Sequence, residues 1–293
     1  MTNHSVKNSS WYKFKNILGK VLIYAGLALY ALWILMPFAI VFLTSFKPDS
    51  EVGTSQYNLF PKEWVLLGYE AALNYGANLS GNSAMITGLI NTLMYVLPPT
   101  ILGLTASALA AFAFSKMKFK GSNFLFGFLL MTMLIPGSVM LVPSYVIYDT
   151  IGWTNSPLPL LIPGMFGAAA CVFFLKQFFT GIPTELVEAA KLDGLGFFGI
   201  FAKIFVPLSL PALFAQGLLG FIGGYNDYFG PYIYLTDPDS YTLQVVIHEL
   251  ADTITETPSI MAACILAMIP TILIYLFCQK YFVEGISTSG MKL

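Results

Sequence analysis

Six long apolar segments, separated by short polar stretches, constrain this chain more than any other feature of its sequence. They lie near residues 21–43, 86–113, 124–148, 157–179, 206–230 and 259–280. Each is long enough to cross the hydrocarbon core of a bilayer as an α-helix, which takes about 20 apolar residues. Because lipid offers no hydrogen-bonding partners, backbone polar groups must be satisfied within each helix. The sequence therefore predicts an all-α polytopic membrane protein with six transmembrane helices.

Composition agrees with a helical membrane protein, and the residue pattern argues against an outer-membrane barrel and against a cleaved signal peptide. Hydrophobic residues make up 57% of the chain and charged residues 10%, and mean hydropathy is +0.74, which is typical of polytopic membrane proteins. The alternation of an outer-membrane barrel is absent. The first apolar run is too long for a signal peptide, and no small-residue cleavage site follows it. We expect 21–43 to be an uncleaved transmembrane helix.

The basic residues predict the orientation. There are 14, all of them lysine, and six spans place 12 on one side. These are Lys7, Lys13, Lys15, Lys20, Lys116, Lys118, Lys120, Lys176, Lys191, Lys203, Lys280 and Lys292. The positive-inside rule makes that side cytoplasmic. Both termini are therefore expected inside, and the loops 44–85 and 231–258 outside.

A polar stretch between the fourth and fifth segments carries a distinctive pattern. Glu188-Ala-Ala-Lys-Leu-Asp-Gly194 is followed, after nine residues, by Ile204-Phe-Val-Pro207. Thr184 is placed to cap the start of a short helix, and early carboxylates suit the positive end of its dipole. Gly194 is placed to end the helix in a left-handed cap. The pattern predicts a short amphipathic helix lying along the cytoplasmic membrane surface.

The expected docking face of this helix consists of Leu186, Ala189 and Ala190, which share one side at i, i+3 and i+4 spacing. Alanines keep the face shallow, so a partner protein could approach closely. An ordinary interfacial helix between two spans is the plain alternative. The E-A-A triplet alone does not separate the two, whereas its conjunction with Gly194, Ile204 and Pro207 is much more specific.

The stretch resembles the EAA signature of permease subunits in ATP-binding-cassette (ABC) importers, in which E-A-A precedes a glycine and then I-x-L-P. Only Val206, in place of leucine, departs from the pattern. In that family the loop is the docking element for a cytoplasmic ATPase. The resemblance implies a coupling role for Glu185, Glu188, Ala189, Ala190, Asp193, Gly194, Ile204 and Pro207.

Further stretches resemble the carbohydrate-uptake branch, and within it the MalG-like half of the maltose-type permeases. They are Pro37 to Pro48, Ala110 to Lys116, Pro136 to Tyr145, Phe173 to Phe179, Tyr225 to Asp227 and Gln279 to Gly285. The resemblance covers nearly the whole chain from about Pro37 onward. It implies the type I importer (MetI-like) fold, in which a five-helix core follows a first helix that wraps a partner.

The implied organisation has five parts. A cytoplasmic tail covers 1–20, the first transmembrane helix 21–43 and an extracytoplasmic loop 44–85. The permease core follows over 86–280, with the coupling loop at 181–204 inside it, and a cytoplasmic tail ends the chain at 281–293.

The implied partners are a second homologous permease, two cytoplasmic ABC ATPases that bind ATP and magnesium, and an extracytoplasmic solute-binding protein. The complex would lie in a bacterial cell membrane. No G-x-x-x-x-G-K-S/T sequence is present, so this chain is not expected to bind ATP, and no other cofactor is expected on it. Nothing points to nucleic acid.

Candidate substrate contacts are Tyr225, Asn226 and Asp227, which resemble the W-N-D of the family. Asp227 is the acidic residue closest to the interior of a span, where such residues are functional candidates. The triplet either lines the substrate path or orders the outer loop. The family resemblance implies a sugar, expected to be a di- or oligosaccharide, with glycerol phosphate or another polar solute as the alternative. The spans have no arginine and their lysines lie at the cytoplasmic ends, which favours a neutral sugar over a phosphate.

Two rival classes find no support in the residues. A membrane enzyme needs a nucleophile–base or metal-ligand set, and the two histidines, His4 and His248, fall in a predicted tail and loop. The cysteines, Cys171, Cys264 and Cys278, lack disulfide or metal spacing and read as packing residues. A self-contained secondary transporter would show inverted repeats or buried proton-relay acids. We therefore predict a non-catalytic transport subunit without a metal site.

Small residues form two further candidate faces. Gly103, Ser107 and Ala111 share one side of the second segment, and Gly217, Gly220 and Gly224 one side of the fifth. Such faces allow close helix contact in membranes. They suit either a moving interface or static packing.

Overall fold

The computed structural model describes residues 10–53, 58–76 and 82–290, so His4, Lys7 and Lys292 lie outside the described residues. The described ranges contain helices and no strand. The chain forms two compact units, Met1–Ala72 with Ile254–Ile265, and Leu73–Thr253 with Leu266–Leu293. The long α14 (Thr257–Gly290) contributes residues to both.

The first unit contains α1 (Ser10–Thr44), a 35-residue helix that begins well before the predicted span at 21–43. Side chains from 21 to 39 are all exposed, and they are apolar around the whole helix. Beyond α1, the ring of Phe46 contacts the rings of Trp64 and Tyr69 at centroid distances of 5.5 and 5.1 Å. A helix that is apolar all round requires lipid or another membrane helix to cover it.

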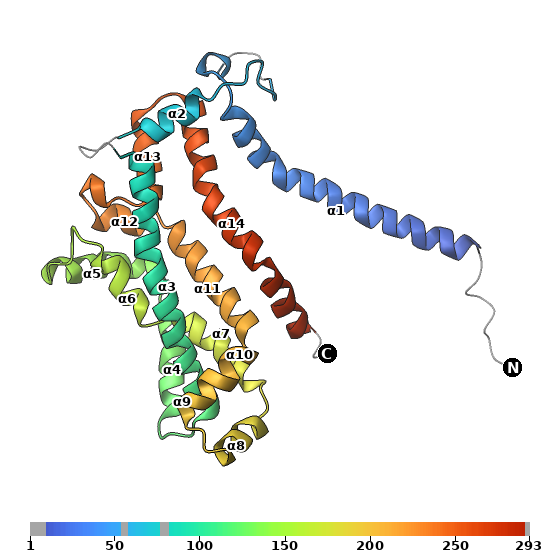
Figure 1. The fold of residues 1–293 in the computed structure, drawn as a ribbon, viewed down its shortest axis with the longest axis vertical. Helices are drawn as coiled ribbons and strands as arrows, with labels where there is room; N and C mark the ends of the chain where they lie inside the picture. The colour runs from blue at the N-terminus through green and yellow to red at the C-terminus, as the bar shows by residue number, and fades with distance from the viewer. Residues whose placement is uncertain (1–9, 54–57, 77–81, 291–293) are drawn as a thin grey trace. The chain divides into compact units, whose positions relative to one another are not determined.

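The second unit is arranged around α3 (Ala84–Lys116), which runs its whole length (Figure 1). The other helices of this unit, apart from α14, follow in chain order: α4 (Ser122–Thr132), α5 (Gly137–Thr150), α6 (Leu158–Met165), α7 (Ala169–Thr180), α8 (Glu185–Leu192), α9 (Phe197–Ile200), α10 (Val206–Leu208), α11 (Leu210–Tyr225), α12 (Phe229–Tyr234) and α13 (Leu243–Thr253). A π-helical turn over Phe201–Phe205 joins α9 to α10. α3 packs against α6, α7, α11 and α13.

The predicted small-residue faces are confirmed as close helix contacts. A Cβ on Gly103 would collide with the Gly164 carbonyl oxygen, and one on Gly224 would lie 2.9 Å from Cγ1 of Val96. Ser107 is 1% exposed, and its Oγ accepts a hydrogen bond of 3.1 Å from the Ala168 amide. The close α3–α6 and α3–α11 packing therefore depends on glycines, which have no Cβ.

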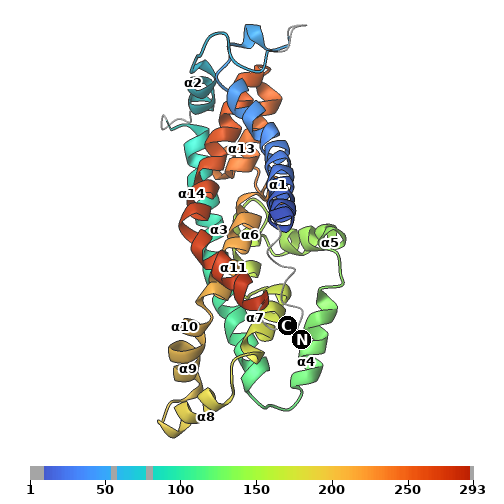
Figure 2. The same cartoon turned by 90° about the vertical axis from the view of Figure 1, so that its right-hand side faces the viewer.

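Two predicted spans are not single straight helices. The predicted span 124–148 divides into α4 and α5, which meet at 94° (Figure 2). The predicted span 206–230 belongs to an apolar pair, Phe197–Leu208 and Leu210–Tyr225, bent by 81°. Pro136 and Pro211 stand at these breaks, and proline supplies no amide hydrogen to the preceding turn. In the described residues four helices are long and apolar enough to cross a membrane, or six if each bent pair counts as one span.

The predicted outside loop 231–258 also differs, because it contains α12 in part and the whole of α13. Leu243, Val246 and Leu250 are buried at helical spacing along α13. That spacing is visible in the sequence and was the signal for a helix there. His248 consequently lies on a helix and not in a loop.

Candidate functional site

The segment from α8 to α10 lies at one end of the second unit, at the C-terminal end of α3 (Figure 1). Lys116, Lys118 and Lys120 end α3 or follow it, and Lys191 and Lys203 lie in the segment itself. The opposite end of α3 contacts the polypeptide around Tyr241, because the Asn91 side chain donates to the Asp239 and Tyr241 carbonyls. The candidate coupling segment is therefore at the lysine-rich end of the unit.

The start of α8 agrees with the prediction in position but not in detail. Thr184 precedes Glu185, yet its side chain makes no capping hydrogen bond. Its backbone is helical, with φ −71° and ψ −24°, whereas a side-chain cap normally requires an extended residue at this place. The Thr184 carbonyl instead accepts from the amides of Val187 and Glu188, at 2.9 and 3.1 Å.

The end of α8 confirms the predicted left-handed cap. Gly194 has φ +82°. Its amide donates to the Lys191 carbonyl and the Leu195 amide to the Ala190 carbonyl, both at 3.0 Å. This pair of bonds is a Schellman motif, which satisfies carbonyls left over at a helix end. Gly194 thus sets the direction in which the chain leaves α8.

The predicted docking face of α8 was wrong in part. Val187 and Ala190 are 3% and 4% exposed and pack into the main apolar core, whereas Leu186 and Ala189 are exposed. Residues three apart lie on one side of a helix, so the buried side passes through 187 and 190. Ala190 holds the helix against the core instead of facing a partner.

The outward side carries charges and two apolar side chains that sequence reasoning missed. Leu192 is 90% exposed and Phe198 is 74% exposed. Leu192 lies next to charged residues, and that contrast was the available signal for it, whereas Phe198 falls in the apolar stretch 195–201 and gave no such signal. Glu185, Glu188 and Asp193 are also exposed. An exposed large apolar side chain bordered by charged residues marks a candidate contact with another protein.

Phe205 anchors the segment in the unit. It is fully buried, and its ring lies 4.8 Å from that of Phe112 on α3 and 5.4 Å from that of Phe179 on α7, edge-on in both cases. Ile204 is half-buried against the same core, whereas Pro207 is exposed. Displacement of the segment would therefore be transmitted directly to α3 and α7.

The junction with α11 is a sharp break. The 81° bend lies at Ser209, which is fully buried and whose hydroxyl has no partner among the described residues. Pro207 and Pro211 flank it, and the preceding turn is π-helical. Irregular turns of this kind often occur at functional positions.

A cavity of about 340 Å³ lies among α3, α6 and α11. Its lining is mainly apolar, with a few polar groups that include Tyr95, Gln216 and Asp227. Asp227 also accepts a hydrogen bond of 3.2 Å from the Gly230 amide. A mainly apolar cavity with a few polar groups is the usual form of a small-molecule site.

The other two candidate path residues have different surroundings. Tyr225 is 1% exposed, and its hydroxyl donates to the Ala267 carbonyl at 2.9 Å. Asn226 is exposed, and its side chain donates to the Ile222 carbonyl one turn earlier. Of the triplet, only Asp227 lines the cavity, so substrate contact remains a prediction.

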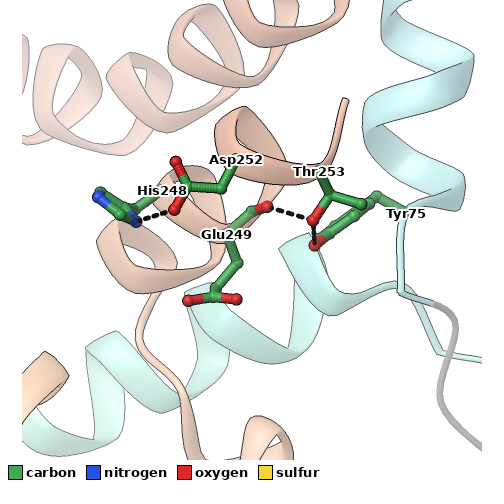
Figure 3. Close-up of polar contacts among 5 residues, drawn as sticks. All are labelled: Tyr75, His248, Glu249, Asp252 and Thr253. Atoms are coloured by element: carbon green, nitrogen blue, oxygen red, sulfur yellow. Dashed lines mark hydrogen bonds and ion pairs between the residues drawn. The ribbon is translucent and has the colours of Figure 1, made fainter. Parts of the chain in front are cut away.

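A polar and aromatic cluster surrounds α13 (Figure 3). His248 Nδ1 lies 3.4 Å from Asp252 Oδ2, an ion pair when the ring is protonated. The same ring stacks on Tyr228 at 4.7 Å. The Tyr75 hydroxyl lies 3.2 Å from Thr253 Oγ1, which donates to the Glu249 carbonyl.

Tyr241 lies near this cluster. Burial raises the pKa of Tyr241, and the charge of Glu249 raises it further. Among the described residues no group of His, Cys, Asp or Glu could hold a metal ion.

Comparisons with known proteins identify a family and several relatives. The model of the binding-protein-dependent transport system inner membrane component family matches residues 103–288. The arabinooligosaccharides transport system permease protein AraQ of Bacillus subtilis is 30% identical over 261 residues, which are 88% of this chain and 90% of that protein. The sn-glycerol-3-phosphate transport system permease protein UgpE of Yersinia pestis is 30% identical over 263 residues, 88% of this chain and 92% of that one.

A solved structure shows the same fold. A bacterial ABC transporter involved in the import of the acidic polysaccharide alginate contains a chain that matches with a TM-score of 0.79 and 23% identity. The match covers 95% of this chain and 100% of that one. The predicted all-α permease fold is thereby confirmed.

Proposed function

This chain belongs to the binding-protein-dependent transport system inner membrane component family, and from that membership we propose that it forms half of the translocation pathway for a neutral di- or oligosaccharide. It is a membrane-embedded, non-catalytic permease subunit of an ABC importer. The observation that best supports coupling to an ATPase is the α8–α10 segment. It presents Leu192 and carboxylates outward, and the buried Phe205 anchors it to the core.

The sugar class is supported by chemistry as well as by relatives. The cavity wall combines apolar surface with Tyr95 and Gln216, a combination that suits the apolar faces and hydroxyls of a sugar ring. Glycerol phosphate is the second candidate, because UgpE is named for it. Phosphate recognition usually uses arginine or lysine, and neither lines this cavity.

The partners are inferred from the family, and two exposed surfaces of this chain are suited to them. Two cytoplasmic ATPases, which carry ATP and magnesium, would include one that docks on α8. A second permease would cover the apolar surface of α1, and an extracytoplasmic binding protein would deliver the sugar. The lysine-rich end would face the cytoplasm of a bacterial cell, and an even number of spans would leave both termini on that side of the membrane.

In the proposed cycle, ATP binding closes the ATPase dimer and displaces α8. The displacement passes through Phe205 to α3 and α7, and the break at Ser209 lets α11 change its angle relative to α10. The cavity beside α3 then opens alternately to the two sides of the membrane, as a domain-rocking transition.

The test is uptake by the purified assembly in liposomes loaded with ATP. Neutral oligosaccharides and glycerol 3-phosphate are supplied outside with the binding protein, and the parent is compared with Glu188→Lys and Gly194→Pro. We expect ATP-dependent oligosaccharide uptake by the parent, and its loss in both variants together with loss of ATPase association. Uptake of glycerol 3-phosphate alone would favour the second candidate. Uptake without any ATPase, or normal uptake by both variants, would contradict the proposal.

A further inference from the structure

The side chain of Lys116 is half-buried and bonds to another segment of the chain. Lys116 is the last residue of α3, and its Nζ donates a hydrogen bond of 2.6 Å to the Ile182 carbonyl, 66 residues further along the chain. A lysine at the end of a membrane span ordinarily extends into the headgroup region. Here the half-buried side chain turns to a backbone oxygen on another segment.

The acceptor is a carbonyl in the link between two helices. α7 ends at Thr180, and the Gly181 and Ile182 amides still donate back to Phe178 and Phe179. Pro183 follows Ile182 and has no amide hydrogen of its own. A cation at this point satisfies a carbonyl beyond a helix end, where the dipole is negative. A hydrogen bond from a charged donor is stronger than one between neutral groups.

Two further contacts bring Lys116 to the coupling segment. Its Nζ lies 5.9 Å from the centroid of the Phe205 ring, within the range of a cation–π contact. The carboxylate of Glu185, the first residue of α8, interacts electrostatically with the same ammonium group. One side chain therefore joins the end of α3 to the α7–α8 link, to α8 and to the π-helical turn.

The neighbouring lysines do not make such a connection. Lys176 lies over the Phe126 ring at 3.8 Å, and Lys191 over the Phe197 ring at 4.9 Å, the latter within the coupling segment itself. Lys118 is exposed and has no hydrogen bond or ion pair with another described residue. Lys118 thus provides a matched control, two residues from Lys116 and equal in charge.

We propose that Lys116 is a positioning residue that locks the start of the coupling helix to α3, so that displacement of α8 moves the wall of the cavity. The inference rests on the proposed function, because it assigns a transmission role within the same coupling site. Without the ammonium group, α8 would still bind the ATPase through its outward side. Part of its displacement would then be lost in the α7–α8 link, and only the part carried by the Phe205 contacts would still reach α3 and α7.

The experiment compares Lys116→Met, Lys116→Arg and Lys118→Met in the assembled transporter. Sugar uptake and ATP hydrolysis are measured on the same liposomes, and their ratio is the readout. For Lys116→Met we expect the ratio to fall about tenfold, the effect of losing one charge-assisted hydrogen bond, with ATP hydrolysis retained. Lys116→Arg should restore the ratio, because its guanidinium can reach the same carbonyl, and Lys118→Met should keep it.

A second readout does not depend on transport. Hydrogen exchange of the α8 amides should accelerate in Lys116→Met, whereas exchange in α11 should stay as in the parent. If Lys116→Met does not assemble, Lys116→Gln, which keeps a donor without the charge, is measured in the same two ways. An unchanged uptake-to-hydrolysis ratio, or unchanged exchange in α8, would overturn the role of Lys116. A parent that shows no ATP-dependent sugar uptake would instead remove the proposed function, and the exchange measurement would still decide the Lys116 contact.

Discussion

Gly103 of α3 and Gly164 of α6 meet backbone to backbone. A Cβ on Gly103 would overlap the Gly164 carbonyl oxygen, well inside the van der Waals distance, and a backbone atom cannot turn aside as a flexible side chain can. We therefore expect Gly103→Ala to force α3 and α6 apart and to lower the free energy of unfolding by roughly 1–3 kcal/mol. Thermal unfolding in detergent measures the change.

Gly220→Ala is the control for this contact. Gly220 lies on α11, and its added Cβ would be 3.8 Å from Cγ2 of Thr100, an ordinary contact. It should unfold within a few degrees of the parent. Equal losses in the two variants would show that close backbone approach is not the reason.

Gly194→Ala should weaken coupling through backbone conformation alone. Gly194 has φ +82°, and nothing lies within 4 Å of the position of an added Cβ. A left-handed alanine costs about 1–2 kcal/mol, so the Schellman cap should fray and ATPase association should fall roughly fivefold to tenfold. Association is measured by binding of the purified ATPase to the immobilised permease.

Two substitutions separate this effect from crowding. Gly194→Asn should recover most of the association, because asparagine tolerates the left-handed region. Gly196→Ala should change nothing, since Gly196 has φ −74° and equally open surroundings. A loss of association in Gly196→Ala similar to that in Gly194→Ala would argue against a conformational cause.

Leu192→Ser should remove ATPase association without affecting stability. The side chain is 90% exposed, so folding buries almost none of it, whereas docking would bury it fully. We expect at least a tenfold weaker affinity and an unchanged melting temperature. Val187→Ala is the complementary variant, because Val187 is 3% exposed. Val187→Ala should lower the free energy of unfolding by about 1–3 kcal/mol. Parent-like ATPase association in Leu192→Ser would show that the docking surface lies elsewhere.

Tyr225→Phe should affect stability and leave substrate binding unchanged. Its hydroxyl donates to the Ala267 carbonyl and lies in a fully buried position, so its loss should cost about 1 kcal/mol. The KM for sugar uptake should remain that of the parent. Asp227→Asn is the contrast, since asparagine retains an oxygen for the Gly230 amide and removes only the charge. If Asp227 contacts the sugar, the KM for sugar uptake should rise in Asp227→Asn. A raised KM in Tyr225→Phe would show instead that Tyr225 also contacts the substrate.

The sequence alone predicted the features that depend on nearby residues. Apolar segments identify helices able to cross a membrane because hydrocarbon requires about 20 consecutive apolar residues whatever the rest of the chain does. Gly194 was placed correctly as a left-handed cap because the preference of glycine for positive φ is local. The spacing of Glu188, Gly194 and Pro207 was sufficient to indicate the family.

Tertiary structure decided the features that depend on contacts between distant segments. The buried side of α8 is the one with Val187 and Ala190, because the core formed with α3 and α7 meets it there. The bends of 81° at Ser209 and 94° between α4 and α5 lie at prolines that the sequence shows, but only the structure gives their angles. The hydrogen bond from Lys116 to Ile182 spans 66 residues. Hydropathy and helix propensity are sums over neighbouring residues and carry no information about such pairs, so only the folded chain brings these two groups together.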